Sequence, residues 1–84
     1  MRIEMLATDF EAYRQPYTTM FGHLVQPTLS EAVSAFFKDC GHRGTVEPVS
    51  IYRGWIEITV TGNLPAIFST NGQAHNTVFY RKVG

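Results

Sequence analysis

Cysteine and long apolar runs are both scarce in this chain of 84 residues. Cys40 is the single cysteine, which rules out a disulfide within the chain and, with it, a disulfide-stapled secreted scaffold. No apolar run approaches the roughly 20 residues that span a bilayer. Residues 1–9 contain an early acidic residue and only a short apolar stretch, unlike a signal peptide. We therefore expect a cytoplasmic protein with no membrane association.

Net charge is absent as well, since seven Lys and Arg residues balance seven Asp and Glu residues. Non-specific nucleic-acid binders usually carry a basic surface that neutralises phosphates, so the composition disfavours that class. A chain without net charge also lacks the self-repulsion that keeps protein molecules apart. We therefore expect self-association, as a homodimer.

Repeats, low-complexity segments and linkers are missing too, so we expect residues 1–84 to form a single domain. The content of 44% hydrophobic and 17% charged residues suits one small core and excludes a disordered chain. Four prolines and seven glycines separate the expected elements.

The clearest of these elements is a helix over residues 29–40. Thr28 and Glu31 have the spacing of a capping box, in which each side chain bonds to the backbone of the other residue. Gly41 suits the left-handed position that ends a helix. Apolar residues recur at steps of three and four residues and form one stripe, widened by Phe37: Leu29, Ala32, Val33, Phe36 and Cys40. The core residues that we expect on it are Leu29, Val33 and Phe36.

A β-hairpin is expected next, with strands over residues 46–52 and 55–61 joined by a two-residue Arg53-Gly54 turn. This turn sets Ile51 opposite Ile56 and Val49 opposite Ile58, with both pairs facing the helix. The pairs Tyr52/Trp55 and Ser50/Glu57 then share the other face. Register and polarity agree, which a slip by one residue would destroy. Pro48 makes the first strand an edge strand or interrupts it.

Four further segments have weaker patterns. Residues 17–25 and 77–83 have the Thr, Tyr, Phe and Val content of strands, the former broken by Gly22. Within residues 2–14 the sequence leaves strand and helix open. Residues 63–75 could form either a hairpin with the last strand or a loop, and the sequence does not decide between them.

The order of the expected elements predicts an α+β fold in two layers, with one helix packed on one face of a four- or five-stranded, mainly antiparallel sheet.

Residues that could hold a metal or perform nucleophilic catalysis are few. Asp39, Cys40 and His42 would need a distant His to complete a metal site, and Cys-x-His is a poor zinc spacing. Cys40 with His42 or His75 as a base would place a thiolate at a helix C-terminus, whose dipole raises a thiol pKa. We therefore expect no catalytic residues, no metal and no cofactor.

The sequence from Arg53-Gly54-Trp55 onward begins like the strand signature of an RNA-binding domain, but the later positions do not match it. That strand signature puts stacking aromatics at the positions of Trp55, Glu57 and Val60, and two of these are not aromatic. A nucleic-acid-binding module that uses Arg53, Arg81 and Lys82 beside the aromatic residues therefore stays an alternative.

Tyr52, Arg53 and Trp55 are the candidate binding residues for a protein interface. Two large aromatics lie at a turn on an otherwise polar face. Either they clamp the hairpin as a cross-strand pair, or they form a contact patch, because Trp, Tyr and Arg are enriched in binding hot spots.

The function that we expect is that of a small non-enzymatic binding or regulatory protein acting through a macromolecular interface, such as an accessory or inhibitory protein of a mobile element. A homodimer and a protein partner are expected, with the terminal strand 77–83 as the candidate dimer edge. The alternative from another class is a small enzyme or ligand carrier. It would use a pocket between helix and sheet with His23 or His75 at its mouth.

Overall fold

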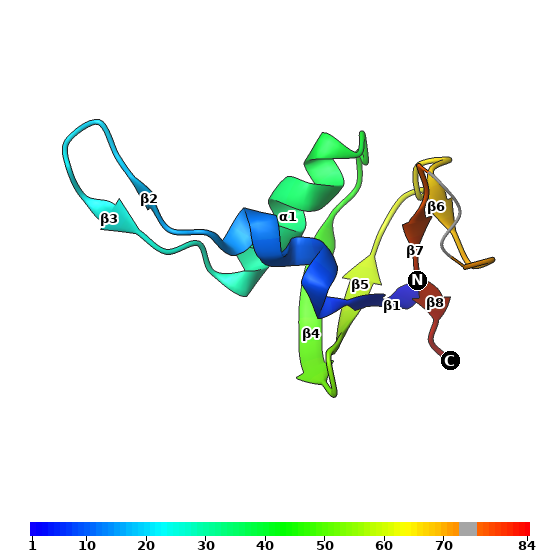
Figure 1. Cartoon of the computed structure of the whole chain (residues 1–84). Helices are drawn as coiled ribbons and strands as arrows, with labels where there is room; N and C mark the ends of the chain where they lie inside the picture. The colour runs from blue at the N-terminus through cyan, green and yellow to red at the C-terminus, as the bar shows by residue number, and fades with distance from the viewer. Residues whose placement is uncertain (73–75) are drawn as a thin grey trace.

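A four-stranded antiparallel sheet with the strand order β4-β5-β1-β8 forms one layer of the protein (Figure 1). The computed structural model describes residues 1–72 and 76–84. Its elements are β1 (Arg2–Leu6), the 3-10 helix η1 (Ala7–Arg14), β2 (Tyr17–Thr18), β3 (Leu24–Val25), α1 (Leu29–Asp39), β4 (Val46–Tyr52), β5 (Trp55–Val60), β6 (Phe68–Ser69), β7 (Val78–Phe79) and β8 (Arg81–Lys82).

The second layer consists of α1 and η1, which pack against each other while α1 contacts β4. The predicted fold class, α+β with a helix on one face of a mainly antiparallel sheet, is confirmed. The open choice over residues 2–14 resolves into both elements in turn, because β1 is an inner strand of the sheet and η1 follows it directly.

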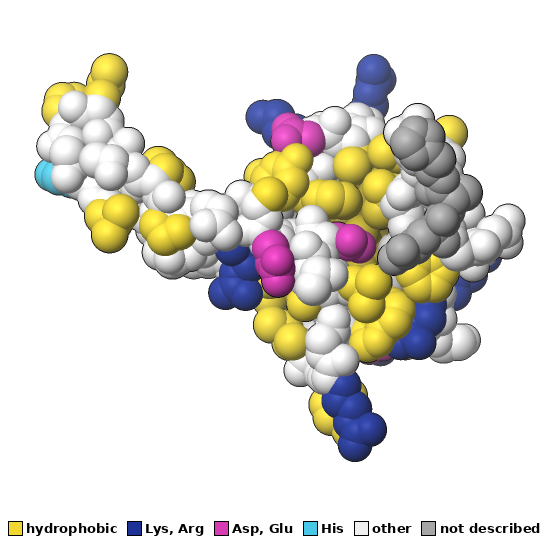
Figure 2. Space-filling model, viewed as in Figure 1, with side chains coloured by type: hydrophobic (Ala, Val, Ile, Leu, Met, Phe, Trp, Pro, Cys, Tyr) yellow, Lys and Arg dark blue, Asp and Glu magenta, His cyan; other side chains and the backbone are white. Residues whose placement is uncertain are grey.

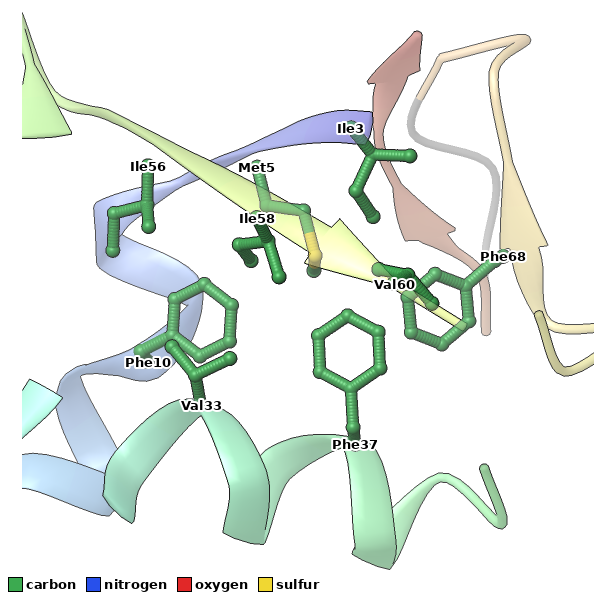
Figure 3. Close-up of a cluster of buried hydrophobic side chains, with 9 residues drawn as sticks. All are labelled: Ile3, Met5, Phe10, Val33, Phe37, Ile56, Ile58, Val60 and Phe68. Atoms are coloured by element: carbon green, nitrogen blue, oxygen red, sulfur yellow. The ribbon is translucent and has the colours of Figure 1, made fainter. Parts of the chain in front are cut away.

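The core lies between the layers (Figure 3). Ile3 and Met5 of β1 pair in register with Ile58 and Ile56 of β5, so that four apolar side chains share the inner face. Helix side chains approach them from the other layer, and Phe68 of β6 closes one end. The buried cluster comprises Ile3, Met5, Phe10, Val33, Phe37, Ile56, Ile58, Val60 and Phe68.

Helix α1 begins and ends as the sequence predicts. The Glu31 amide donates to the Thr28 hydroxyl at 3.1 Å, and the Thr28 amide donates to the Glu31 carboxylate at 3.0 Å. Gly41 is left-handed with φ of 87°. The Gly41 amide donates a hydrogen bond to the Lys38 carbonyl, and the His42 amide donates one to the Phe37 carbonyl. These two hydrogen bonds form a Schellman motif.

The buried stripe of α1 is rotated from the one that the sequence indicates. Val33 is fully buried as expected, but Phe37 is buried and Phe36 is only partly so. Successive helical residues point about 100° apart. The Phe37 ring meets Phe68 at 5.2 Å, whereas Phe36 turns towards η1 and packs edge-on against Phe10 at 5.0 Å. Leu29 is likewise only partly buried.

The β4–β5 hairpin has the expected turn and three of the four expected residue pairs. Arg53 and Gly54 both have positive φ, 51° and 82°, as a tight two-residue turn of this type requires. The pairs Ile51/Ile56, Tyr52/Trp55 and Ser50/Glu57 are confirmed. The pair Val49/Ile58 is wrong, because a β-bulge between Pro48 and Ser50 sets Pro48 opposite Ile58. Val49 is the extra residue of the bulge and is exposed.

The strand predicted over residues 77–83 forms two short strands, β7 and β8, which belong to different sheets. β8 pairs antiparallel with β1 at the edge of the main sheet, and β7 pairs in parallel with β6. A parallel pair cannot be a hairpin, so the hairpin alternative for residues 63–75 is wrong over the residues that are described there.

Residues 17–25 do not join the main sheet. They form a separate antiparallel hairpin, β2–β3, which projects away from both layers (Figure 1). The molecule measures 43 × 25 × 24 Å, and this projection accounts for its long axis. We call residues 17–25 the arm.

Candidate interaction surfaces

The arm is bounded by Pro16 on one side and by Gln26-Pro27 on the other. Its ladder comprises two residue pairs, Tyr17/Val25 and Thr18/Leu24. The tip closes with hydrogen bonds from the Thr19 amide to the His23 carbonyl at 2.8 Å and from the Gly22 amide to the Thr19 carbonyl at 2.9 Å. Gly22 has φ of 83°, a left-handed conformation that suits glycine. The turn therefore has a defined shape.

Large apolar side chains on the arm are exposed to an unusual degree. The exposed fractions are 53% for Tyr17, 91% for Met20, 82% for Phe21 and 75% for Leu24. The arm contains no Asp, Glu, Lys or Arg, and His23 is its one basic side chain. Figure 2 shows these apolar side chains along the arm, with a single His among them. An uncharged apolar ribbon of this kind differs from the charged edges that proteins usually expose to water.

An open groove of about 570 Å³ adjoins the base of the arm. The side-chain amide of Gln26 donates to the Arg14 carbonyl and ties the arm base to η1. The Tyr13 hydroxyl donates to the Asp39 carboxylate at 2.6 Å, which holds the Tyr13 ring beside Phe36 and raises the Tyr13 pKa. The groove is lined by Ala12, Tyr13, Gln15, Pro16, Tyr17, Pro27, Glu31 and Ala35.

The β4–β5 turn presents Tyr52 and Arg53, two of the three predicted interface residues. Tyr52 is 68% exposed, and the Arg53 guanidinium lies 5.2 Å from the centre of its ring. Arg53 holds a left-handed conformation that Asn or Gly would adopt more easily. The turn therefore displays a paired cation and aromatic ring at some conformational cost.

Trp55, the third predicted residue, lies in different surroundings. It is half-buried on the outer face of the sheet, where the Arg81 guanidinium covers its ring at 3.5 Å and the Phe79 ring meets it at 6.2 Å. Arg81 also pairs with Glu4 at 3.0 Å. The structure thus brings Tyr52 and Arg53 together, and brings Trp55 into a cluster with the C-terminal strands.

The two edges of the main sheet are protected against pairing with another chain. β4 carries Pro48, which lacks an amide hydrogen, and the bulge at Val49 interrupts its ladder. β8, within the predicted dimer edge, has only two residues. The exposed apolar side chains of β4, Val49, Ile51 and Tyr52, therefore lie on an edge poorly suited to strand addition.

The chemically reactive groups near the helix end are engaged within the fold. Burial and the neighbouring Asp39 charge raise the pKa of the Cys40 thiol, which disfavours a thiolate. The His42 ring bonds the Thr61 carbonyl at 2.8 Å and packs on Phe37. Across residues 1–72 and 76–84, no three His, Cys, Asp or Glu side chains lie where they could hold a metal ion.

Two alternatives from the sequence depend on other residues. His23, proposed at the mouth of a helix–sheet pocket, lies at the tip of the arm, and His75 lies outside the described residues. Of the three positions in the RNA-binding signature, Val60 is fully buried and cannot stack on a base.

In the described part of the chain, no helix has the length and apolar character needed to cross a bilayer.

The sequence did not single out the arm as an exposed apolar surface, because the composition of residues 17–25 is that of an ordinary strand. The available signal was a segment without charged residues, bracketed by Pro16 and Pro27, with Met20-Phe21 beside Gly22 at its centre. Comparison of the chain with protein-family models, with curated proteins and with solved structures finds no match.

Proposed function

We propose that this chain is a small non-enzymatic binding protein that acts through a macromolecular interface, and that the arm is its principal contact surface. The observation that carries the proposal is the exposure of Met20 and Phe21 on an uncharged ribbon that projects from the body. Exposed apolar patches on a protein of this size favour partner binding, because leaving them in water costs free energy.

The turn at Tyr52 and Arg53 supports a second contact. Aromatic residues and arginine are the residues most often found as hot spots in protein interfaces. The turn holds Arg53 at a positive φ, which fixes the position from which its side chain is presented next to Tyr52. Trp55 takes the supporting role in this proposal, because its ring contacts lie within the sheet and not at the turn.

Photocrosslinking in the cells that produce the chain tests this proposal. A benzoylphenylalanine group at position 21 should give a discrete adduct of higher mass, and the same group at exposed Thr70 should not. A second substitution, Leu24→Ser, should abolish the adduct at position 21 while the circular dichroism spectrum stays that of the folded chain. Equal labelling at positions 21 and 70, or no adduct at either, would contradict the proposal.

A further inference from the structure

The arm has a ladder of two residue pairs and buries little of its own apolar surface. An isolated two-stranded hairpin is marginally stable in water and usually needs packing against another element. Here Tyr17, Met20, Phe21 and Leu24 all remain largely exposed. A surface that packs on these side chains would complete the arm, and its chemistry must be apolar and nearly uncharged.

The groove at the base of the arm has that chemistry. Its lining is aromatic, proline and alanine side chains for the most part, and Glu31 is its one charged residue. The Glu31 carboxylate is already engaged by the Thr28 amide at 3.0 Å. At about 570 Å³ the groove falls within the size range of pockets that bury a compact apolar ligand. His23 at the tip of the arm carries no negative charge, so a tip that enters the groove is not repelled by Glu31.

We propose that the occupant is a second copy of this chain: two arms lie antiparallel across a two-fold axis, and the Met20-Phe21 tip of each fills the groove at the base of the other. The inference rests on the proposed function and names its partner. Because the groove adjoins the arm base, an antiparallel pair of arms brings each tip to the other copy's groove. The arrangement is self-complementary and closes at two copies.

The area available suits a stable dimer. Tyr17 and Leu24 lie on opposite faces of the ladder, so one partner surface covers Met20, Phe21 and one of these two side chains. That coverage removes on the order of 400 Å² from each arm. With the receiving surfaces included, two such contacts bury about 1,600 Å², which lies within the range of specific, stable interfaces. The chain has no net charge, so two copies approach without overall repulsion.

Other occupants fit the arm less well. A ribbon that enters a nucleic-acid groove needs cations to neutralise phosphates, and the arm contains no Lys or Arg. A membrane-inserting tip usually has basic residues beside it that attract anionic lipids, and these are missing from the arm as well. The protected edges of the main sheet direct association away from strand addition and towards the arm.

Sedimentation of the purified full chain with two complementary variants tests the inference. Wild type should sediment as a dimer of the 9.5 kDa chain, with the monomer appearing on dilution. Phe21→Ser removes the tip and Ala35→Gln blocks the groove. Each should weaken self-association at least about 30-fold, the loss expected at a hot spot. Ser34→Gln, on the exposed face of the same helix, is the matched control and should remain dimeric.

Mixing the two variants distinguishes tip-in-groove packing from contact between two tips. The mixed pair retains one intact tip and one intact groove, so it should associate more tightly than either variant alone. No gain on mixing, a wild type that is monomeric at every concentration, or binding of the wild type to neutral vesicles would each overturn the inference. A crosslink from position 21 to a different protein, with a monomeric purified chain, would leave the proposed function standing and remove only the second copy.

Discussion

Replacing Trp55 by alanine separates a structural residue from a contact residue on the outer face of the sheet. Truncating a fully buried Trp costs about 3–5 kcal/mol, and the partial exposure of Trp55 reduces this cost to about 2–3 kcal/mol. Loss of the Arg81 guanidinium from its position 3.5 Å above the ring adds about 0.5–1 kcal/mol. We therefore expect Trp55→Ala to destabilise the fold by about 2.5–4 kcal/mol.

Thermal unfolding followed by circular dichroism measures this loss. For a domain of this size, a loss of about 2.5–4 kcal/mol lowers Tm by about 10–30 °C. The matched control is Tyr52→Ala, which removes an exposed aromatic from the opposite strand and should shift Tm by only a few degrees. All samples need one protein concentration, because self-association makes Tm depend on concentration. A Trp55→Ala melt within a few degrees of wild type would refute the structural role and return Trp55 to the contact surface.

Three further predictions concern the body of the protein. Thr28→Ala should lower the free energy of unfolding in urea by about 1 kcal/mol, because it removes the hydroxyl that caps α1; an unchanged midpoint would contradict the capping role. Phe37→Ala should cost about 3–5 kcal/mol and Phe36→Ala clearly less, since only Phe37 is fully buried; the reverse order in the same titration would show that the helix face is wrongly described. Gly44→Ala should cost on the order of 3 kcal/mol or prevent folding, because the new Cβ would lie 1.9 Å from the Thr61 carbonyl oxygen; a soluble variant with a normal melt would refute that packing.

Local signals in the sequence were sufficient for the elements whose shape depends on nearby residues. The capping box at Thr28, the stop at Gly41 and the Arg53-Gly54 turn all act within a few residues, and the structure confirms each of them. The rotation of a helix about its own axis cannot be predicted from local signals, because it depends on which other elements cover each face of the helix. Phe36 and Phe37 both extend the apolar stripe, and only the positions of η1 and Phe68 determine which of them is buried.

The arm and the bulge could not be predicted for a related reason. Strand content in residues 17–25 indicates β structure but not its partner, and here the segment pairs with itself instead of joining the main sheet. Pro48 indicated that its strand is an edge strand or is interrupted. The position of the bulge at Val49 could not be predicted, because it depends on the pairing register between β4 and β5. Of the predicted interface, Tyr52 and Arg53 lie together at the turn, whereas the contacts of Trp55 with Arg81 bring in a strand that the sequence left unpaired.

Amide hydrogen exchange of the arm at two protein concentrations tests the central claim most directly. Its two-pair ladder should open readily in a free monomer, so the amides of Thr19 and Gly22 should exchange quickly at low concentration. If a second copy covers the arm, exchange within residues 17–25 slows as concentration rises, while the amide of Gly54, in the exposed β4–β5 turn outside the arm, is unaffected. Arm amides that exchange at the same rate at both concentrations, in a range where the mass of the species also stays at 9.5 kDa, would contradict the account.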